Sequence, residues 1–255
     1  MKKVFFSLVS LVLLLGSVAV AGNISVEVVA DQGYIFPAYP VNGPTDTYRA
    51  YVQAEHNARY GLRIRNHTNR RIGLVVAVDG RNIISGKKSY LRNTERMYIL
   101  DPYGIAVYRG WRTGQDEVHR FYFTESSNSY AGAWGDESAM GVIAVAAFAE
   151  KIEQVHRPMP QPRLYSGSPR QKARESVPAE DSAAGTGYGE GEYSSSVRVE
   201  FHPEPYPLEQ HFYKYEWHET LCHKRIISCS PSYPRQPPQN RFWPDDDYAP
   251  PPPGY

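Results

Sequence analysis

The sequence predicts an all-β fold: an antiparallel β-sandwich or jelly-roll-like domain, with a disordered linker and a Pro-rich C-terminal tail. Aromatic residues make up 13% of the 255 residues, and tyrosine alone occurs 20 times, which is typical of chains rich in strands. The chain also has 20 glycines and 21 prolines. Short apolar runs separated by such turn residues favour a sandwich.

An export signal peptide is predicted over residues 1–21. A basic start at Lys2 and Lys3 precedes an apolar run, and Ala19-Val20-Ala21 fits the small-x-small pattern of a signal peptidase site. The run is shorter than the roughly 20 residues of a membrane-spanning helix. The mature protein should therefore begin at Gly22, be periplasmic or secreted, and have no integral membrane segment. No cysteine follows the cleavage site, so a lipid anchor is not expected.

The charge balance predicts no nucleic-acid partner. The chain has 28 Lys and Arg against 27 Asp and Glu, and removal of residues 1–21 takes away two lysines, which leaves a net charge of −1. A nearly neutral chain lacks the basic surface that binds nucleic acid or an anionic membrane. No cofactor is predicted either, and nothing in the composition indicates an oligomeric state.

Changes in composition divide the mature chain into four segments. Residues 22–155 should form a β-rich domain, and residues 156–196, rich in Pro, Ser, Gly and charge, a flexible linker or long loop. Residues 197–229 regain strand character and should rejoin the same domain, because so few strands bury too little apolar surface alone. Residues 230–255 should be a Pro-rich disordered tail.

Two consecutive hairpins are expected between residues 60 and 84. Residues 60–65 alternate between apolar and charged side chains, and a turn follows at residues 66–69. Residues 72–78 are apolar on both faces, as in a central strand buried on both sides. Asp79-Gly80 then favours a two-residue type I′ turn, because this turn requires positive φ at both residues.

Further short strands are expected later in the chain. Residues 96–100 and 105–111 flank a β-turn at Asp101-Pro102-Tyr103-Gly104. Residues 141–149 are apolar all round, and the lack of an amphipathic stripe favours a buried strand over a buried helix. The remaining candidates alternate with a period of two: residues 117–123, 197–202 and 211–220.

Several blocks of the sequence resemble a group of exported bacterial proteins of unknown function. The resemblance covers roughly residues 48–227, and it implies no activity and no catalytic residue. It implies only that the C-terminal strands belong to the same domain as the rest. The blocks are VDGRNIISG at 78–86, ERMYIL at 95–100, GWRT at 110–113, RFYFT at 120–124, SAMGVI at 138–143 and YEWHETLC at 215–222.

Cys222 and Cys229 are the only cysteines, and outside the cytoplasm they should form a disulfide rather than remain free thiols. The alternative is a metal site, because His218, Cys222 and His223 offer imidazole and sulfur ligands suited to zinc or copper. Their spacing matches no standard zinc motif, and the local pattern indicates a strand running into a turn. The disulfide is therefore preferred.

Trp111, Arg112 and Trp134 are the candidate ligand-binding residues. The tryptophans lie close to the acidic pairs Asp116-Glu117 and Asp136-Glu137, an arrangement that suits a sugar-binding cleft. Packing in the core and on the sheet surface explains these aromatic residues more simply. No Gly-x-Ser-x-Gly elbow is present, and no catalytic residue is predicted.

The sequence therefore favours an exported, non-enzymatic envelope protein with a structural or protein-interaction role, whose partner is an envelope protein or a glycan. The Pro-rich tail supports this interpretation, because such segments are extended ligands for aromatic grooves. One alternative is a glycan-binding module or hydrolase acting on cell-wall or surface polysaccharide. A second is a metal carrier. A concave aromatic patch with converging polar groups would decide for ligand binding.

Overall fold

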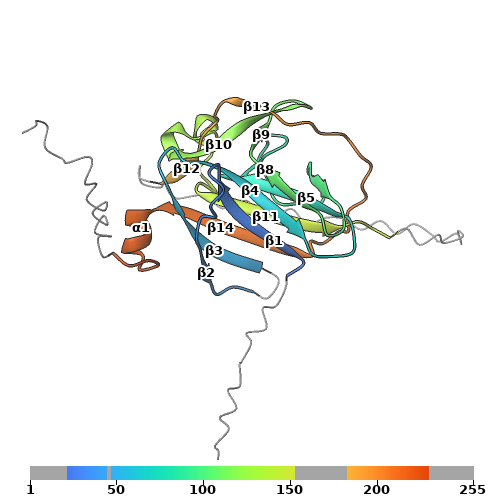
Figure 1. Cartoon of the computed structure of the whole chain (residues 1–255), viewed down its shortest axis with the longest axis horizontal. Helices are drawn as coiled ribbons and strands as arrows, with labels where there is room; N and C mark the ends of the chain where they lie inside the picture. The colour runs from blue at the N-terminus through green and yellow to red at the C-terminus, as the bar shows by residue number, and fades with distance from the viewer. Residues whose placement is uncertain (1–21, 45–46, 153–182, 230–255) are drawn as a thin grey trace, which may run out of the picture.

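A computed structural model describes residues 22–44, 47–152 and 183–229. These residues form two seven-stranded sheets that share one hydrophobic core (Figure 1), which confirms the predicted all-β sandwich. The predicted signal, the tail and residues 156–182 of the predicted linker lie outside the described residues. No helix in the described part of the chain is long and apolar enough to span a bilayer.

The first sheet is antiparallel and is built around β4 (Arg59–Asn66) and β10 (Glu117–Glu125). Its strands alternate between buried and more exposed side chains, so that Leu62, Ile64, Phe121 and Phe123 are fully buried in the core. The strand order is β1 (Ile24–Ala30), β4 (Arg59–Asn66), β10 (Glu117–Glu125) and β12 (Ala184–Thr186), with β8 (Ile105–Tyr108) paired to β4, and β9 (Gly110–Arg112) and β13 (Gly191–Tyr193) paired to β10.

The second sheet has one parallel pair, which the sequence did not predict. The C-terminal strand β14 pairs in parallel with β3 and antiparallel with β11, and Figure 1 shows it in orange between them. The strand order is β2 (Ala38–Val41), β3 (Thr47–Ala54), β14 (Glu209–Trp217), β11 (Val142–Ala149), β5 (Ile72–Val78) and β6 (Arg81–Asn82), with β7 (Tyr98–Leu100) paired to β5.

Both faces of β5 are covered, as its uninterrupted apolar sequence predicts. One face points into the main core between the sheets. On the other face Val75 and Phe148 form a smaller cluster under Leu91 and Met97. The segment between β6 and β7 therefore shields the outer surface of the second sheet.

Of the two expected hairpins, one is present and the other is not. The Asp79-Gly80 turn joins β5 to β6, and the φ angles of 49° and 76° have the signs of a type I′ turn. By contrast, β4 and β5 do not pair, because the chain crosses from the first sheet to the second between them. The same crossing separates β7 from β8, although the predicted β-turn is present, with the Gly104 N–H donating to the Asp101 carbonyl at 2.9 Å.

The buried side chain of Asn66 explains these crossings. Its amide nitrogen donates to the carbonyls of Arg70 at 2.7 Å and Asp101 at 2.9 Å, and its Oδ1 accepts from the Thr68 N–H at 2.8 Å. Only 1% of Asn66 is exposed. One side chain thus satisfies the backbone at both corners, where an ordinary hairpin would use ladder hydrogen bonds.

Residues 141–149 are confirmed as strand, since β11 covers Val142–Ala149. The strand expected at residues 197–202 is wrong: this segment is not part of a sheet, and Val197 is 77% exposed. Part of the expected linker is instead ordered, because β12 and β13 both pair with β10.

Three short helices complete the described residues. After β14 the chain forms a helix where a turn was expected, with Leu221 buried beneath it. The helices are η1 (Ser126–Asn128), η2 (Gly132–Trp134) and α1 (His218–His223).

Candidate functional site

A pocket of about 370 Å³ lies where four segments of the chain meet. These are the loop after β6, strand β9, the connection between η1 and η2, and the loop between β12 and β13. The described residues that line it are mostly aromatic or small and include no carboxylate: Ile83, Ser85, Gly86, Trp111, Arg112, Thr113, Tyr130 and Tyr188.

Three aromatic rings form a continuous wall. The Tyr130 ring centre lies 4.4 Å from that of Trp111 and 5.6 Å from that of Tyr188, which it faces in a stacked arrangement. His119 stacks on Tyr188 at 4.1 Å. Trp111 is only 2% exposed, and its indole N–H donates to the Gly187 carbonyl at 3.1 Å. The Trp111 ring is therefore held in place at the bottom of the wall. The Tyr188 ring is 42% exposed and faces solvent.

Two hydroxyl groups at this wall are free to bind. Neither Tyr130 Oη nor Tyr188 Oη forms a hydrogen bond with another described residue. Burial, together with nearby Tyr130 and Glu117, raises the pKa of Tyr188, so this hydroxyl is neutral and both donates and accepts near neutral pH. A Cβ on Gly86 would lie 2.7 Å from Tyr130 Oη, so the glycine makes room for this hydroxyl.

Arg112, predicted to bind a ligand, mainly supports the loop beside the pocket. Its guanidinium donates to Tyr98 Oη at 2.8 Å, to the Gln115 carbonyl at 2.9 Å and to the Ser194 carbonyl at 2.9 Å. Further bonds reach the Gly114 carbonyl and Ser194 Oγ. Most of its N–H groups are used within the protein, so a binding site for anions is not favoured here.

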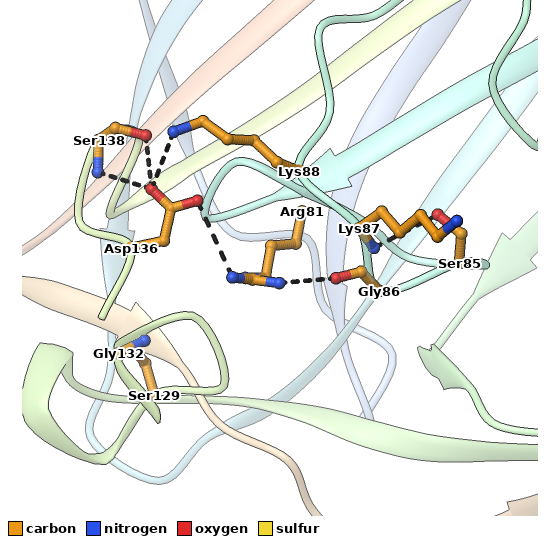
Figure 2. Close-up of polar contacts among 9 residues, drawn as sticks. All are labelled: Arg81, Ser85, Gly86, Lys87, Lys88, Ser129, Gly132, Asp136 and Ser138. Carbon is orange, nitrogen blue, oxygen red and sulfur yellow. Dashed lines mark hydrogen bonds and ion pairs between the residues drawn. The ribbon is translucent and has the colours of Figure 1, made fainter. Parts of the chain in front are cut away.

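Polar contacts join the loop after β6 to the segment around η2 (Figure 2), and one of them ends at Gly86, which lines the pocket. Arg81 donates to the Gly86 carbonyl at 2.8 Å, lies 4.0 Å from Asp136 and covers the Trp134 ring at 5.1 Å. Asp136 also accepts from Ser138 Oγ at 2.6 Å. Partial burial opposes ionisation, but these bonds from Ser138 and the charge of Lys88 lower the pKa of Asp136.

The structure thus separates the three predicted ligand-binding residues. Trp111 and Arg112 line the pocket, whereas Trp134 does not; it is 64% exposed, with its ring centre 6.3 Å from that of Tyr130. Asp136 is not an ordinary solvated turn residue, because its side chain is only 12% exposed.

Tyr188 was not predicted as a site residue, because the glycine-rich segment around it has the composition of a linker. One feature of the sequence could have indicated that this segment packs closely against the domain: glycine occupies every second position from 185 to 191. A Cβ on Gly185 would lie 2.6 Å from Ser129 Cβ, one on Gly187 2.1 Å from the Tyr122 ring, and one on Gly189 2.9 Å from the Arg120 carbonyl. The glycines therefore allow this segment to lie directly against β10 and its neighbours.

A second polar cluster, sealed inside the core, supports the same segment. Asp79 accepts hydrogen bonds from the N–H groups of Gly141 at 2.8 Å and Thr186 at 2.7 Å, and from Tyr215 Oη at 2.5 Å. Thr186 Oγ1 lies 2.7 Å from both Tyr215 Oη and Tyr60 Oη. The network joins the two sheets and fixes β12, two residues before Tyr188.

Burial raises the pKa of Asp79 to about 6, although the bonds from Tyr215, Thr186 and Gly141 and the charge of Lys214 counteract the shift. A raised carboxyl pKa in a protein often indicates a catalytic acid. Here Asp79 is completely buried and its oxygens are occupied by protein donors. We therefore assign this cluster to the stability of the fold.

The residues proposed as metal ligands lie around α1 but do not converge. Cys222 and Cys229 form a disulfide with a Cα–Cα distance of 5.0 Å, so the Cys222 sulfur is not a thiolate. His218 and His223, at the two ends of α1, are at least partly exposed, and His218 Nδ1 lies 3.3 Å from Gln53 Oε1. No group of three or more His, Cys, Asp or Glu in the described segments is arranged to hold a metal ion.

The geometry of the pocket is therefore the main indication of function. It combines an aromatic wall with two hydroxyls that bond to no other described residue, and no acid is among its described lining residues. Comparison with protein-family models, curated proteins and solved structures finds no match to this chain.

Proposed function

We propose that this protein is an exported, non-enzymatic binding protein of the bacterial envelope that holds a cell-wall or surface glycan in the pocket between Trp111, Tyr130 and Tyr188. The aromatic wall with its two free hydroxyls is the observation that carries the proposal. Export is supported by the predicted signal over residues 1–21.

A glycan suits this pocket because a sugar has both an apolar and a polar surface. The C–H face of a pyranose ring packs against an aromatic ring, which Tyr188 presents to solvent. The hydroxyls at the edge of the sugar need partners, and Tyr130 and Tyr188 offer one each. A volume of about 370 Å³ is at the lower end of the range for small-molecule sites, about 300–1,000 Å³, and fits a short saccharide unit.

The lining also favours binding over hydrolysis. Glycoside hydrolases require two carboxyl groups across the scissile bond, about 5–9.5 Å apart. No acid is among the described residues that line the pocket, and Asp79, a fully buried carboxylate, does not line it. A glycan partner is favoured over a protein partner because the pocket is a small concavity rather than a broad apolar surface.

Binding to insoluble peptidoglycan and to a panel of polysaccharides tests the proposal. Tyr188→Ala should weaken the affinity by about 2- to 12-fold, because loss of a stacked ring costs about 0.5–1.5 kcal/mol. Tyr188→Phe, which removes only the hydroxyl, should have a smaller effect. Trp111 is a poorer choice for mutation, since its burial makes its replacement destabilising.

Tyr206→Ala provides the matched control, because this tyrosine is 80% exposed and does not line the pocket. Its bound fraction should equal that of the unmodified protein, and the melting temperature of all variants should stay close to it. If no glycan is retained, or if Tyr188→Ala is retained as well as Tyr206→Ala, the proposal is wrong.

A further inference from the structure

The carboxylate of Glu209 binds the beginning of the described chain. Glu209 is the first residue of β14, and its Oε2 accepts hydrogen bonds from the backbone N–H groups of Asn23 at 2.6 Å and Ile24 at 3.3 Å. Four residues further along β14, Tyr213 Oη donates to the carbonyl of Val26 in β1 at 2.7 Å. Side chains of the second sheet thus hold the first strand of the other sheet.

Gly22 lies directly against the same carboxylate. A Cβ at this position would lie 2.5 Å from Glu209 Oε1 and 3.0 Å from Oε2. Because a carbon–carbon bond is about 1.5 Å long, the Cα of Gly22 is within about 4 Å of the carboxylate. Any larger residue would displace Glu209. The α-nitrogen of Gly22 is one bond of about 1.5 Å from this Cα, so it lies within about 5.5 Å of the carboxylate.

Glu209 is charged and largely enclosed. Its side chain is 15% exposed, and although burial opposes ionisation, the bonds from His211, Ile24 and Asn23 lower the pKa of Glu209. His211 Nε2 lies 2.8 Å from Oε1. In the part of the chain that the structure describes, no lysine or arginine forms an ion pair with Glu209. An enclosed carboxylate of this kind gains most from a cationic partner.

The predicted signal peptide ends one residue before this position, at Ala21. We propose that Glu209 is the docking site for the new N-terminus that signal cleavage creates. A signal peptidase would hydrolyse the Ala21–Gly22 peptide bond with one water molecule, leaving a carboxylate on Ala21 and an α-ammonium group on Gly22. This group is largely protonated at pH 7. It pairs with Glu209 beside the two N–H bonds already present.

Before cleavage the nitrogen of Gly22 is a neutral amide, so the precursor lacks this ion pair. Processing therefore strengthens the contact between β1 and β14, and the mature protein should be more stable than the same domain with an extended N-terminus. The inference rests on the export that the proposed function includes, but not on the glycan pocket.

The test compares N-termini of the mature protein. Mass spectrometry of the exported protein should give a chain that begins at Gly22. Thermal unfolding should then show a melting temperature about 2–4 °C lower for protein that is Nα-acetylated at Gly22, or that retains Ala21, than for protein with a free Gly22 amine. Acetylation removes the charge and adds little else at this end.

Glu209→Gln should abolish the difference between the free and the acetylated protein. Glu200→Gln, which changes a carboxylate that is 87% exposed, should preserve it. Equal melting temperatures for the free and acetylated unmodified protein would overturn the inference, as would a mature chain that starts elsewhere. The comparison of free and acetylated protein needs no mutation, so it tests the inference even if Glu209→Gln does not fold. Glycan retention, measured on the same protein, tests the proposed function separately.

Discussion

Asp79 has both a backbone role and a side-chain role in this fold. Its positive φ of 49° begins the type I′ turn between β5 and β6, a role that the sequence predicts from the Asp-Gly pair. Its side chain joins Gly141, Thr186 and Tyr215 across the core, which no local pattern indicates. At the scale of the residue, the conformation was predictable and the partners were not, because the partners are distant in sequence.

The contribution of Asp79 to the stability of the protein should fall as the pH rises from about 4 to about 6. Burial raises the pKa of Asp79 in the folded protein to about 6 from an ordinary value of 3.8, so the folded state favours the protonated carboxyl. This contribution is fully present below the unfolded pKa and is lost above the folded one, and it amounts to about 3 kcal/mol. Urea unfolding between pH 3.5 and pH 7 measures it.

Asp79→Asn should flatten this pH dependence while lowering stability at every pH. An amide presents one oxygen and one NH₂ group, so it cannot accept hydrogen bonds from Gly141 and Thr186 on both sides, and the orphaned N–H costs about 1–3 kcal/mol. Asp101→Asn, at a carboxylate that is 83% exposed, should leave the slope unchanged. An unchanged slope in Asp79→Asn would contradict the assignment.

At the scale of the element, the segment from β12 to β13 connects the core to the pocket. Thr186 is fixed by the buried network, Gly187 accepts the indole hydrogen bond of Trp111, and Tyr188 completes the aromatic wall. Of these three successive residues, Thr186 stabilises the core, Gly187 holds the Trp111 ring, and Tyr188 contributes to the binding surface. The glycines allow the segment to lie directly against β10. They also give it the composition of a linker, so its strands were not predicted from the sequence.

Gly187→Ala should weaken both folding and glycan binding. The added Cβ would lie 2.1 Å from the Tyr122 ring, so the segment must move, at a cost of about 1–3 kcal/mol, and Tyr188 would move with it. Gly114→Ala is a suitable control, because its nearest contact, at 3.9 Å to Glu117 Cβ, is ordinary. If Gly187→Ala matches Gly114→Ala in urea unfolding and in polysaccharide retention, the segment can accommodate a Cβ at position 187, and the prediction is wrong.

The disulfide constrains a short element rather than the whole domain. Cys222 and Cys229 are seven residues apart, so the closed loop is small and the entropic stabilisation is about 2 kcal/mol. Replacing both cysteines by serine should lower the free energy of unfolding by this amount and leave glycan retention unchanged, because α1 is remote from the pocket in sequence and in contacts. Loss of retention in the folded variant would link α1 to the pocket.

At the scale of the whole molecule, the sequence predicted the strands better than their arrangement. Alternation and apolar runs report burial, so β4, β5, β10 and β11 were recognised. They do not report the partner strand, so the crossings held by Asn66 were read as a hairpin. For the site, Trp111 was identified by residue type alone. Tyr188 was not predicted, because only the tertiary fold brings its loop against Tyr130.

The parallel pair of β3 and β14 also has a consequence for the order of events during folding. The two strands pair along their whole length, yet they come from opposite ends of the domain, and β14 also separates β3 from β11. Closing such a long loop is slow, and until it closes, β3 and β11 each have an unpaired edge. The second sheet cannot be completed before β14 has been synthesised, because β14 alone joins the β2–β3 pair to β11 and β5.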